Sequence, residues 1–309
     1  MFTLPIFYHT STLITVDDDD LILKSLALLF KNRFMVMPFH QPKECIKFFD
    51  SYRSPLSKTT LLQSCTEHEQ YDSPYRSFIN FDMTQLHLEN NKHERKNEIS
   101  VMIVDYNMPG MNGIELCKIL RTIPVKKILL TGEASLNEAV AAFNDKVIDC
   151  FIRKDSPSLA HQIQHYVKNL SLQYYREQTN ALCSHLEANG MIPLSDPIFA
   201  QHFSEWCASE SIQEYTLIDR NGSLMAMNND DQASYFIVHT DQSLDAFLEL
   251  NDDVNDAEPF LQDIKQRKLI PFFGTGKECW EFQPNEWQPY LYPPTVLNGR
   301  EKYYWAIVK

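Results

Sequence analysis

Four apolar stretches of the sequence run directly into side chains that can hold a metal ion or an anion. The junctions are residues 13–16 before the acids Asp17 to Asp20, residues 101–104 before Asp105, residues 128–130 before Thr131, and residues 150–153 before Lys154. Carboxylate oxygens are hard ligands of the kind that Mg²⁺ binds, and several carboxylates share one site only with a cation between them. A hydroxyl and an ammonium group are the companions that an acceptor carboxylate would need.

The elements around these junctions predict how the side chains are positioned. Residues 101–104 read as a buried strand, and Pro109, Gly110 and Gly113 break the chain after Asp105. In an open α/β sheet the carboxyl ends of the strands form the edge where ligands bind. Asp105 is therefore a candidate site residue, although a lone acid at this place could equally cap a helix.

An acid cluster, a single acid, a hydroxyl and an ammonium in this chain order resemble the receiver domain of two-component response regulators. The resemblance covers residues 12 to about 170. It implies a doubly wound, parallel, five-stranded α/β sheet of the flavodoxin-like class. It also implies that Asp105 accepts a phosphoryl group from the phosphohistidine of a sensor histidine kinase or phosphotransfer protein, in a reaction that requires Mg²⁺.

The resemblance assigns a role to each site residue. Asp18 is the expected direct Mg²⁺ ligand with Asp105, and Asp17 acts through a water molecule. The remaining roles fall to the main-chain carbonyl of Asn107 as a further metal ligand, to Thr131 and Lys154 as phosphate-binding groups, and to Phe151 as the aromatic switch residue. Asp19 and Asp20 lie outside the motif.

Two features depart from the family pattern. Asp155 follows Lys154 where the family has a proline with a cis peptide bond. A cis bond before a residue other than proline is costly, so a trans bond with a differently placed lysine is one alternative, and the isomer stays open. The spacing from Asp17 to Asp105 is also about twice the usual one, which indicates an insertion at 51–97. We expect helices near 61–65 and 83–96, either packed on the receiver or forming a docking surface for a kinase or second subunit.

The 309 residues leave room for a second domain. We predict a receiver domain over 1–157, a continuous helix within 158–190, and an α+β output domain over 191–309 with an antiparallel sheet. Strands are expected at 215–218, 224–227, 235–239, 269–273, 280–282, 290–296 and 303–308, with hairpins at 219–223 and at Asn298-Gly299. The first and last hairpins look PAS-like, but the strand at 235–239 fits that resemblance poorly.

Charge weighs against a DNA-binding output. From Gly190 to the end there are 8 Lys and Arg against 19 Asp and Glu, a net charge of −11, whereas phosphate contacts supply much of the affinity for DNA. We therefore expect a non-enzymatic output domain that binds a protein or a ligand, as in unconventional regulators of bacterial phosphorelays, including quorum-sensing ones. An atypical transcriptional regulator and an unrecognised enzymatic output stay open.

Three smaller expectations complete the prediction. No apolar run approaches the length of a membrane span, so we expect a cytoplasmic protein with no membrane partner. The helix from Ser158 to about Asn189 should continue past the receiver, with Leu182 and Leu186 packing either on the output domain or in a phosphorylation-sensitive homodimer. His161 and His165 have the spacing of a helical metal pair, but without a third ligand we expect a solvated helix face.

Overall fold

The computed structural model describes residues 4–55, 63–64, 79–80, 96–132, 135–188, 193–251, 258–274, 277 and 279–309. The chain divides into two compact units. The parallel-sheet unit comprises residues 9–60 and 92–178, and the antiparallel-sheet unit comprises residues 1–8, 61–91 and 179–309. Among the described residues, no helix combines the length and the apolar character needed to cross a membrane.

The parallel-sheet unit contains the predicted five-stranded sheet. Its strands are β2 (Thr12–Val16), β3 (Met35–Phe39), β6 (Ile99–Asp105), β7 (Lys126–Thr131) and β8 (Cys150–Arg153). All neighbouring strands are parallel and the order is β3-β2-β6-β7-β8. Every residue of β2, β6 and β7 is buried, as expected for central strands covered on both faces.

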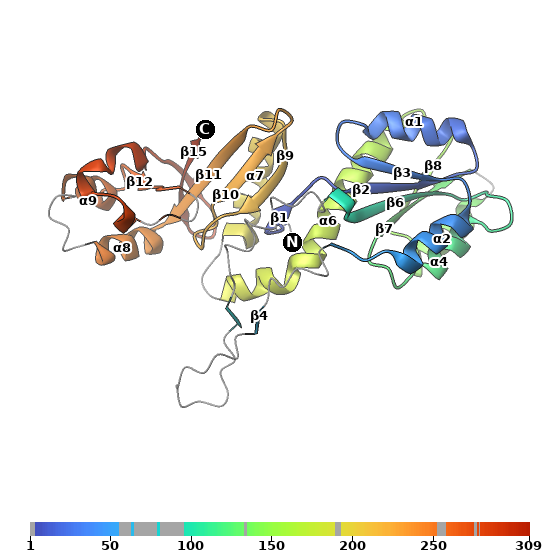
Figure 1. Cartoon of the computed structure of the whole chain (residues 1–309), viewed down its shortest axis with the longest axis horizontal. Coiled ribbons are helices and arrows are strands. Elements are labelled where there is room, and N and C mark those ends of the chain that lie inside the picture. The colour runs from blue at the N-terminus through green and yellow to red at the C-terminus, as the bar shows by residue number, and fades with distance from the viewer. Residues whose placement is uncertain are drawn as a thin grey trace, which may run out of the picture. The chain divides into compact units, whose positions relative to one another are not determined.

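Helices cover both faces of this sheet. They are α1 (Asp20–Phe30), α2 (Pro42–Ser51), α4 (Gly113–Ile119), α5 (Leu136–Asn144) and α6 (Leu159–Ala188). One apolar core joins the sheet to α1 and α6, and the other joins it to α2, α4 and α5. Figure 1 shows α1 on one side of the strands and α2 and α4 on the other. The doubly wound α/β prediction is confirmed.

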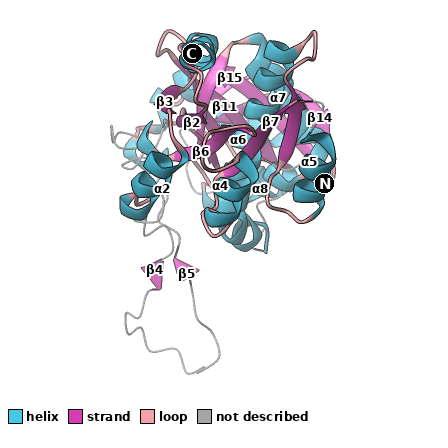
Figure 2. Ribbon diagram, turned by 90° about the vertical axis from the view of Figure 1, so that its right-hand side faces the viewer, coloured by secondary structure: helices cyan, strands magenta, loops and turns pink. Residues whose placement is uncertain are grey.

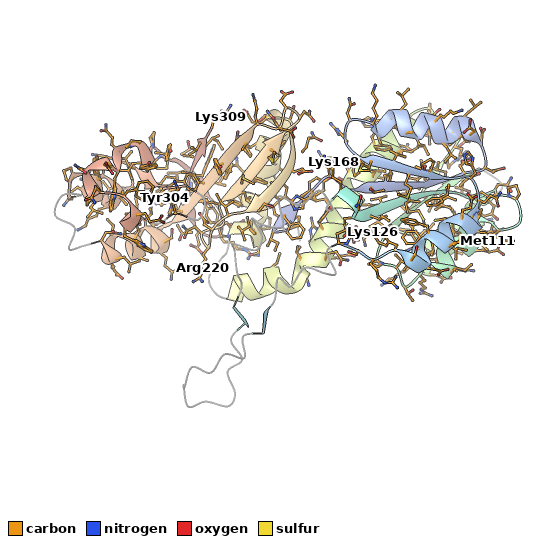
Figure 3. All side chains as sticks on the ribbon, viewed as in Figure 1. Met111, Lys126, Lys168, Arg220, Tyr304 and Lys309 are labelled. Atoms are coloured by element: carbon orange, nitrogen blue, oxygen red, sulfur yellow. The ribbon has the colours of Figure 1, made fainter. Side chains whose placement is uncertain are left out.

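Helix α6 is continuous, as predicted, but it covers more of the parallel sheet than expected. The Tyr174 hydroxyl bonds the buried carboxylate of Glu98, and Lys126 Nζ lies 2.7 Å from Glu177. Lys126 stands at the amino end of β7, at the other end of the sheet from Met111 (Figure 3). The helix was expected to leave the receiver before this point, but polar contacts hold it against the sheet as far as Glu177.

The antiparallel-sheet unit confirms the α+β prediction. Its main sheet has the order β1-β9-β10-β11-β15-β14, and β12 pairs with β13 in a separate ribbon. The strands are β1 (Phe7–Tyr8), β9 (Ile212–Leu217), β10 (Leu224–Asn228), β11 (Ala233–Thr240), β12 (Ile270–Pro271), β13 (Leu291–Tyr292), β14 (Thr295–Asn298) and β15 (Lys302–Val308). Both predicted hairpins are present, as β9–β10 and β14–β15.

Alternating residues of this sheet face two separate helical layers. Strands β11 and β15 run side by side (Figure 2). Phe236 packs against Phe199 of α7 (Pro197–Ser209), with ring centroids 5.7 Å apart. The next residue, Ile237, belongs to the core formed with α8 (Asp241–Leu250) and α9 (Glu258–Lys265). The middle of strand β11 is therefore buried on both faces.

Several details differ from the sequence predictions. Residues 7–8 pair with β9, so the start of the chain belongs to the antiparallel sheet, whereas the predicted receiver domain began at residue 1. The strand predicted over 235–239 is present as β11, and it pairs between the two hairpins that looked PAS-like. Residues 279–281 form a 3₁₀ turn where a strand was expected over 280–282.

The predicted insertion lies mostly outside the described residues. Residues 63–64 are strand β4, paired with β5 (Ile79–Asn80), rather than part of a helix. The second predicted helix, near 83–96, falls almost wholly outside the described ranges.

Candidate functional site

The site lies where the order of the parallel sheet reverses. Strand β2 lies between β3 and β6. After β2 the chain adds β3 on one side, and it then crosses over to add β6, β7 and β8 on the other side. Ligands of doubly wound sheets bind at such a switch point, outside the carboxyl ends of the strands. Asp17 follows β2 directly and Asp105 is the last residue of β6. The order of strands thus brings together two acids that are far apart in the sequence.

Three carboxylates converge there. Asp17, Asp18 and Asp105 each offer an oxygen within 4.8 Å of the others, with Asp17 and Asp105 buried and Asp18 exposed. The other two acids of the run have structural roles. Asp19 caps α1 by accepting a hydrogen bond from Leu21 N at 2.8 Å, and Asp20 pairs with Lys24. The predicted register, which left Asp19 and Asp20 outside the motif, agrees with this division.

Lys154 joins two of the carboxylates. Its Nζ lies 2.9 Å from Asp105 Oδ1 and 3.3 Å from Asp17 Oδ2. No cis peptide bond occurs among the described residues, so the Lys154–Asp155 bond is trans. The sequence left open whether this bond is trans; with the trans bond, the Lys154 ammonium reaches both acids. The main chain is held by Lys154 N donating to Thr131 O at 2.9 Å.

Burial and charge act in opposite directions on these groups. Burial raises the pKa of the Asp17 carboxyl, although the Asp19 amide and the Lys154 charge act to lower it. For Lys154, burial alone would lower the pKa, but the hydrogen bond to Asp105 and the charges of Asp105 and Asp17 outweigh it, so the pKa is raised. Lys154 is therefore a cation, and its positive charge partly offsets the negative charge of the three carboxylates.

Thr131 and Phe151 lie on neighbouring strands next to the acids. Thr131 ends β7 and is fully buried, and its hydroxyl donates to Ser135 Oγ at 3.0 Å. Phe151 is half-buried on β8, and its ring lies 6.3 Å from that of Phe143 in an edge-to-face contact. The Ser135 partner was not predicted, because serine before a helix reads as an ordinary cap.

The turn after Asp105 is held closely to the strand end. Asn107 lies in this turn, two residues beyond β6. Gly113 N donates to Tyr106 O at 2.9 Å, and a Cβ added at Gly113 would lie 2.2 Å from Asp105 O. The hydroxyl of Tyr106 also bonds the carboxylate of Glu138 on α5. The glycine was singled out from the sequence as a chain break, whereas the tyrosine pair was missed.

The residues present fit a magnesium ion. The donor set consists of carboxylate oxygens, which Mg²⁺ prefers, and the exposed Asp18 leaves the cluster open to solvent. Two of the acids are buried, and among the residues that the structure describes Lys154 is the one ammonium group paired with them, so a cation would relieve their mutual repulsion. Asp18 and Asp105 would hold the ion, together with Asp17 and the main chain at Asn107.

Comparisons with known proteins agree with this geometry. Residues 78–164 match the family model of the response regulator receiver domain. The chain is similar to the Legionella pneumophila response regulator LqsR, at 28% identity over 100% of this chain and 90% of that chain, with a TM-score of 0.78. A search of curated proteins finds no match.

Weaker likenesses cover about half of the chain. A response regulator receiver domain protein from Clostridium thermocellum is 17% identical over 56% of this chain and 98% of its own, with a TM-score of 0.34. A structure described as an adenylate cyclase from Rhodopirellula baltica is 19% identical over 56% of this chain and 94% of its own, with a TM-score of 0.38.

Proposed function

Because the chain contains a receiver domain of the response regulator family, we propose that it works as a phosphorylation switch in a two-component phosphorelay, with Asp105 as the phosphoacceptor. The observation that carries this proposal is the contact of the Lys154 ammonium with both Asp105 and Asp17, beside a third carboxylate, at the switch point of a parallel sheet. A histidine kinase or phosphotransfer protein is the donor.

The chemistry follows from the positions of these groups. A carboxylate oxygen of Asp105 attacks the phosphorus of the donor phosphohistidine, a P–O bond forms and the P–N bond breaks. The imidazole leaves and takes up a proton. Lys154, already 2.9 Å from Asp105 Oδ1, can stay beside the new acyl phosphate and pair with its oxygens. The Thr131 hydroxyl would exchange its bond to Ser135 for one to the phosphoryl group.

A magnesium ion, when bound, supplies positive charge that offsets the charge of the phosphoryl oxygens. Burial of Asp105 keeps bulk water from most of its surface, since only 5% of the residue is exposed. The exposed neighbour Asp18 leaves one side of the cluster accessible to a donor protein.

Incubation with acetyl phosphate tests the proposal. Wild type should gain one phosphoryl group per chain with Mg²⁺ and none after chelation, whereas Asp105→Asn should gain none. Asp145→Asn is the matched control, because Asp145 is an exposed acid in the same unit at the end of α5. Equal incorporation into Asp105→Asn and wild type would refute the assignment.

For the antiparallel-sheet unit we propose an output that binds a protein or ligand, without catalysis and without duplex DNA. The net charge of −11 from Gly190 onward supports this. A gel shift by the full-length protein at physiological salt should show no sequence-specific complex at sub-micromolar concentration. Such a complex would favour the second candidate, an atypical transcriptional regulator.

We propose that the relay serves bacterial population signalling, such as quorum sensing, in the cytoplasm. The support is the resemblance of a receiver with a long insertion and an acidic output unit to unconventional regulators of that kind. In the host bacterium, replacing the gene by its Asp105→Asn form should abolish a response that depends on cell density. An unchanged response would contradict this role.

A further inference from the structure

The proposed function leaves one cavity of the parallel-sheet unit unused. It has a volume of about 470 Å³ and is lined by eight residues between Phe151 and Tyr166. These residues come from β8, from the connection after it and from the first two turns of α6. The volume lies within the range typical of small-molecule sites.

The lining consists of hydrogen-bond donors without any acid. Six of the eight residues carry donor groups, namely Arg153, Ser156, His161, Gln162, His165 and Tyr166. None of the eight is acidic, although the chain has 41 Asp and Glu against 28 Lys and Arg. A lining of donors without an acid of its own suits an anion rather than a metal ion, although Asp155 pairs with Arg153 from outside the lining. The two histidines with helical metal spacing therefore lack a carboxylate or thiol ligand in this cavity.

Three of the donors are held in place by residues outside the lining. Arg153 forms two hydrogen bonds to Asp155, from Nε at 2.9 Å and from Nη2 at 2.5 Å. Gln162 Nε2 donates to Ser158 Oγ at 3.2 Å. Side chains fixed before a ligand arrives lose less conformational entropy on binding, so these pairs favour a preformed site.

His165 is fixed in the same way. Its Nε2 lies 2.9 Å from Asn169 Nδ2, and because an amide nitrogen can only donate, the ring accepts at Nε2. With Nε2 engaged by Asn169, Nδ1 is the ring nitrogen left to meet a ligand.

Two aromatic side chains, Phe151 and Tyr166, also line the cavity, together with Ile152. Phe151 is half-buried, and Tyr166 remains 39% exposed although it is a large aromatic side chain. The rings of His165 and Tyr166 are 5.6 Å apart and nearly perpendicular, at 79°. Aromatic side chains beside guanidinium, imidazole and amide donors match a ligand that has a flat ring at one end and an anion at the other.

We propose that this cavity binds a nucleoside monophosphate. The phosphate offers three strong acceptor oxygens, enough to engage several of the six donors, whereas a carboxylate offers two. The base would stack against Phe151 or Tyr166. The lining contains neither the clustered acids nor Lys154, although Arg153 precedes Lys154 directly in the chain and Phe151 is the predicted switch residue.

Calorimetric titration of the full-length protein with AMP, GMP, CMP and UMP tests the site. The protein is kept unphosphorylated and free of Mg²⁺, so the result does not depend on Asp105 accepting a phosphoryl group. At least one nucleotide should bind with a dissociation constant below about 1 mM. Adenosine or the matching nucleoside, and inorganic phosphate, should each bind at least tenfold more weakly.

Two charge variants on the same helix localise the binding. His161→Glu places a carboxylate in the lining and should weaken binding at least tenfold, while Gln164→Glu adds the same charge at an exposed position outside it and should change binding less than twofold. Equal thermal unfolding midpoints of the two variants exclude a folding defect.

Three results would overturn the proposal. They are no binding by any of the four nucleotides, binding that His161→Glu leaves unchanged, and inorganic phosphate binding as tightly as the nucleotides. Saturable binding of an acidic peptide in place of nucleotides would instead assign the cavity to a protein partner.

Discussion

At the scale of single residues, the run of four acids shows how neighbouring carboxylates acquire different roles. Asp17 is buried and bonded by Lys154, Asp18 faces solvent beside the cluster, Asp19 caps a helix and Asp20 pairs with a lysine. The end of the apolar strand set this register, which is why it could be predicted. All four residues are aspartates, so their different roles come from burial, helix capping and ion pairing.

This division predicts unequal losses of metal binding. Asp18→Ala should weaken Mg²⁺ binding at least tenfold, or about 1.4 kcal/mol, because it removes a charged oxygen from the cluster. Asp20→Ala is the control and should change the affinity less than twofold, since Asp20 pairs with Lys24. Calorimetric titration with MgCl₂ measures both. Similar losses from the two variants would show that the register is wrong.

The buried carboxylate of Asp17 should make stability depend on pH. Its pKa is raised, chiefly by burial, so the folded protein holds this proton more tightly than the unfolded chain does. Between the ordinary carboxyl pKa and the raised one, the folded state binds more protons, and the contribution of Asp17 to stability falls as pH rises through this window. At neutral pH without a metal ion, the ionised group is destabilising.

Asp17→Asn keeps an oxygen that can accept from Asp19 N and removes the charge. We expect it to increase the free energy of unfolding at pH 7 without Mg²⁺ by about 1 kcal/mol, with a smaller gain near pH 4. Urea denaturation measures both values. The exposed Asp155, whose pKa is lowered by its hydrogen bond to Arg153, is the control, and Asp155→Asn should give no gain. A variant less stable than wild type at pH 7 would contradict this reasoning.

At the scale of elements, the turn after β6 fixes the acceptor strand to α4. Gly113 begins α4, and an added Cβ would lie 2.2 Å from the main-chain oxygen of Asp105 and 2.9 Å from Leu129 Cδ1. Main chain cannot yield as a flexible side chain can. The structure therefore allows no side chain at this position.

Gly113→Ala should lower the free energy of unfolding by about 2 kcal/mol, as expected for an overpacked position. Gly132→Ala is the control because nothing lies within 4 Å of its added Cβ and its φ is not positive. Chemical denaturation compares the two variants. A Gly113→Ala protein as stable as the Gly132→Ala protein would mean that the turn relaxes without cost.

The elements that sequence reasoning missed depend on partners distant in the chain. Residues 7–8 form a strand only because β9, some two hundred residues later, pairs with them, and nothing local marks so short a segment. Helix α6 covers the sheet beyond Leu170 through polar contacts of Ser171, Tyr174 and Glu177. Apolar periodicity cannot show such contacts. The five parallel strands, by contrast, were predictable from their own apolar runs.

At the scale of the whole molecule, α6 runs from the parallel-sheet unit into the antiparallel-sheet unit, with the division at Thr179. The side chains of Leu182 and Leu186 lie outside the described part of the structure, so their packing stays a prediction. We propose a phosphorylation-sensitive homodimer through this part of the helix, of the coiled-coil type.

Light scattering across micromolar concentrations tests the homodimer. Beryllofluoride should raise the average mass toward that of a dimer, and Leu182→Asp with Leu186→Asp should abolish the rise. Gln178→Asp, which lies earlier on the same helix, is the control and should leave the rise unchanged. One unchanged mass in all conditions would rule out the homodimer.

The central claim is that Asp105 receives the phosphoryl group, and locating that group tests it most directly. After reaction with acetyl phosphate and Mg²⁺, borohydride reduces an aspartyl phosphate to homoserine, which peptide mass spectrometry can locate. The account predicts that this product appears at Asp105, and that it is absent when Mg²⁺ is chelated. Reduction product at Asp17 or Asp18, or at none of the three acids in a protein that has taken up phosphate, would contradict the account.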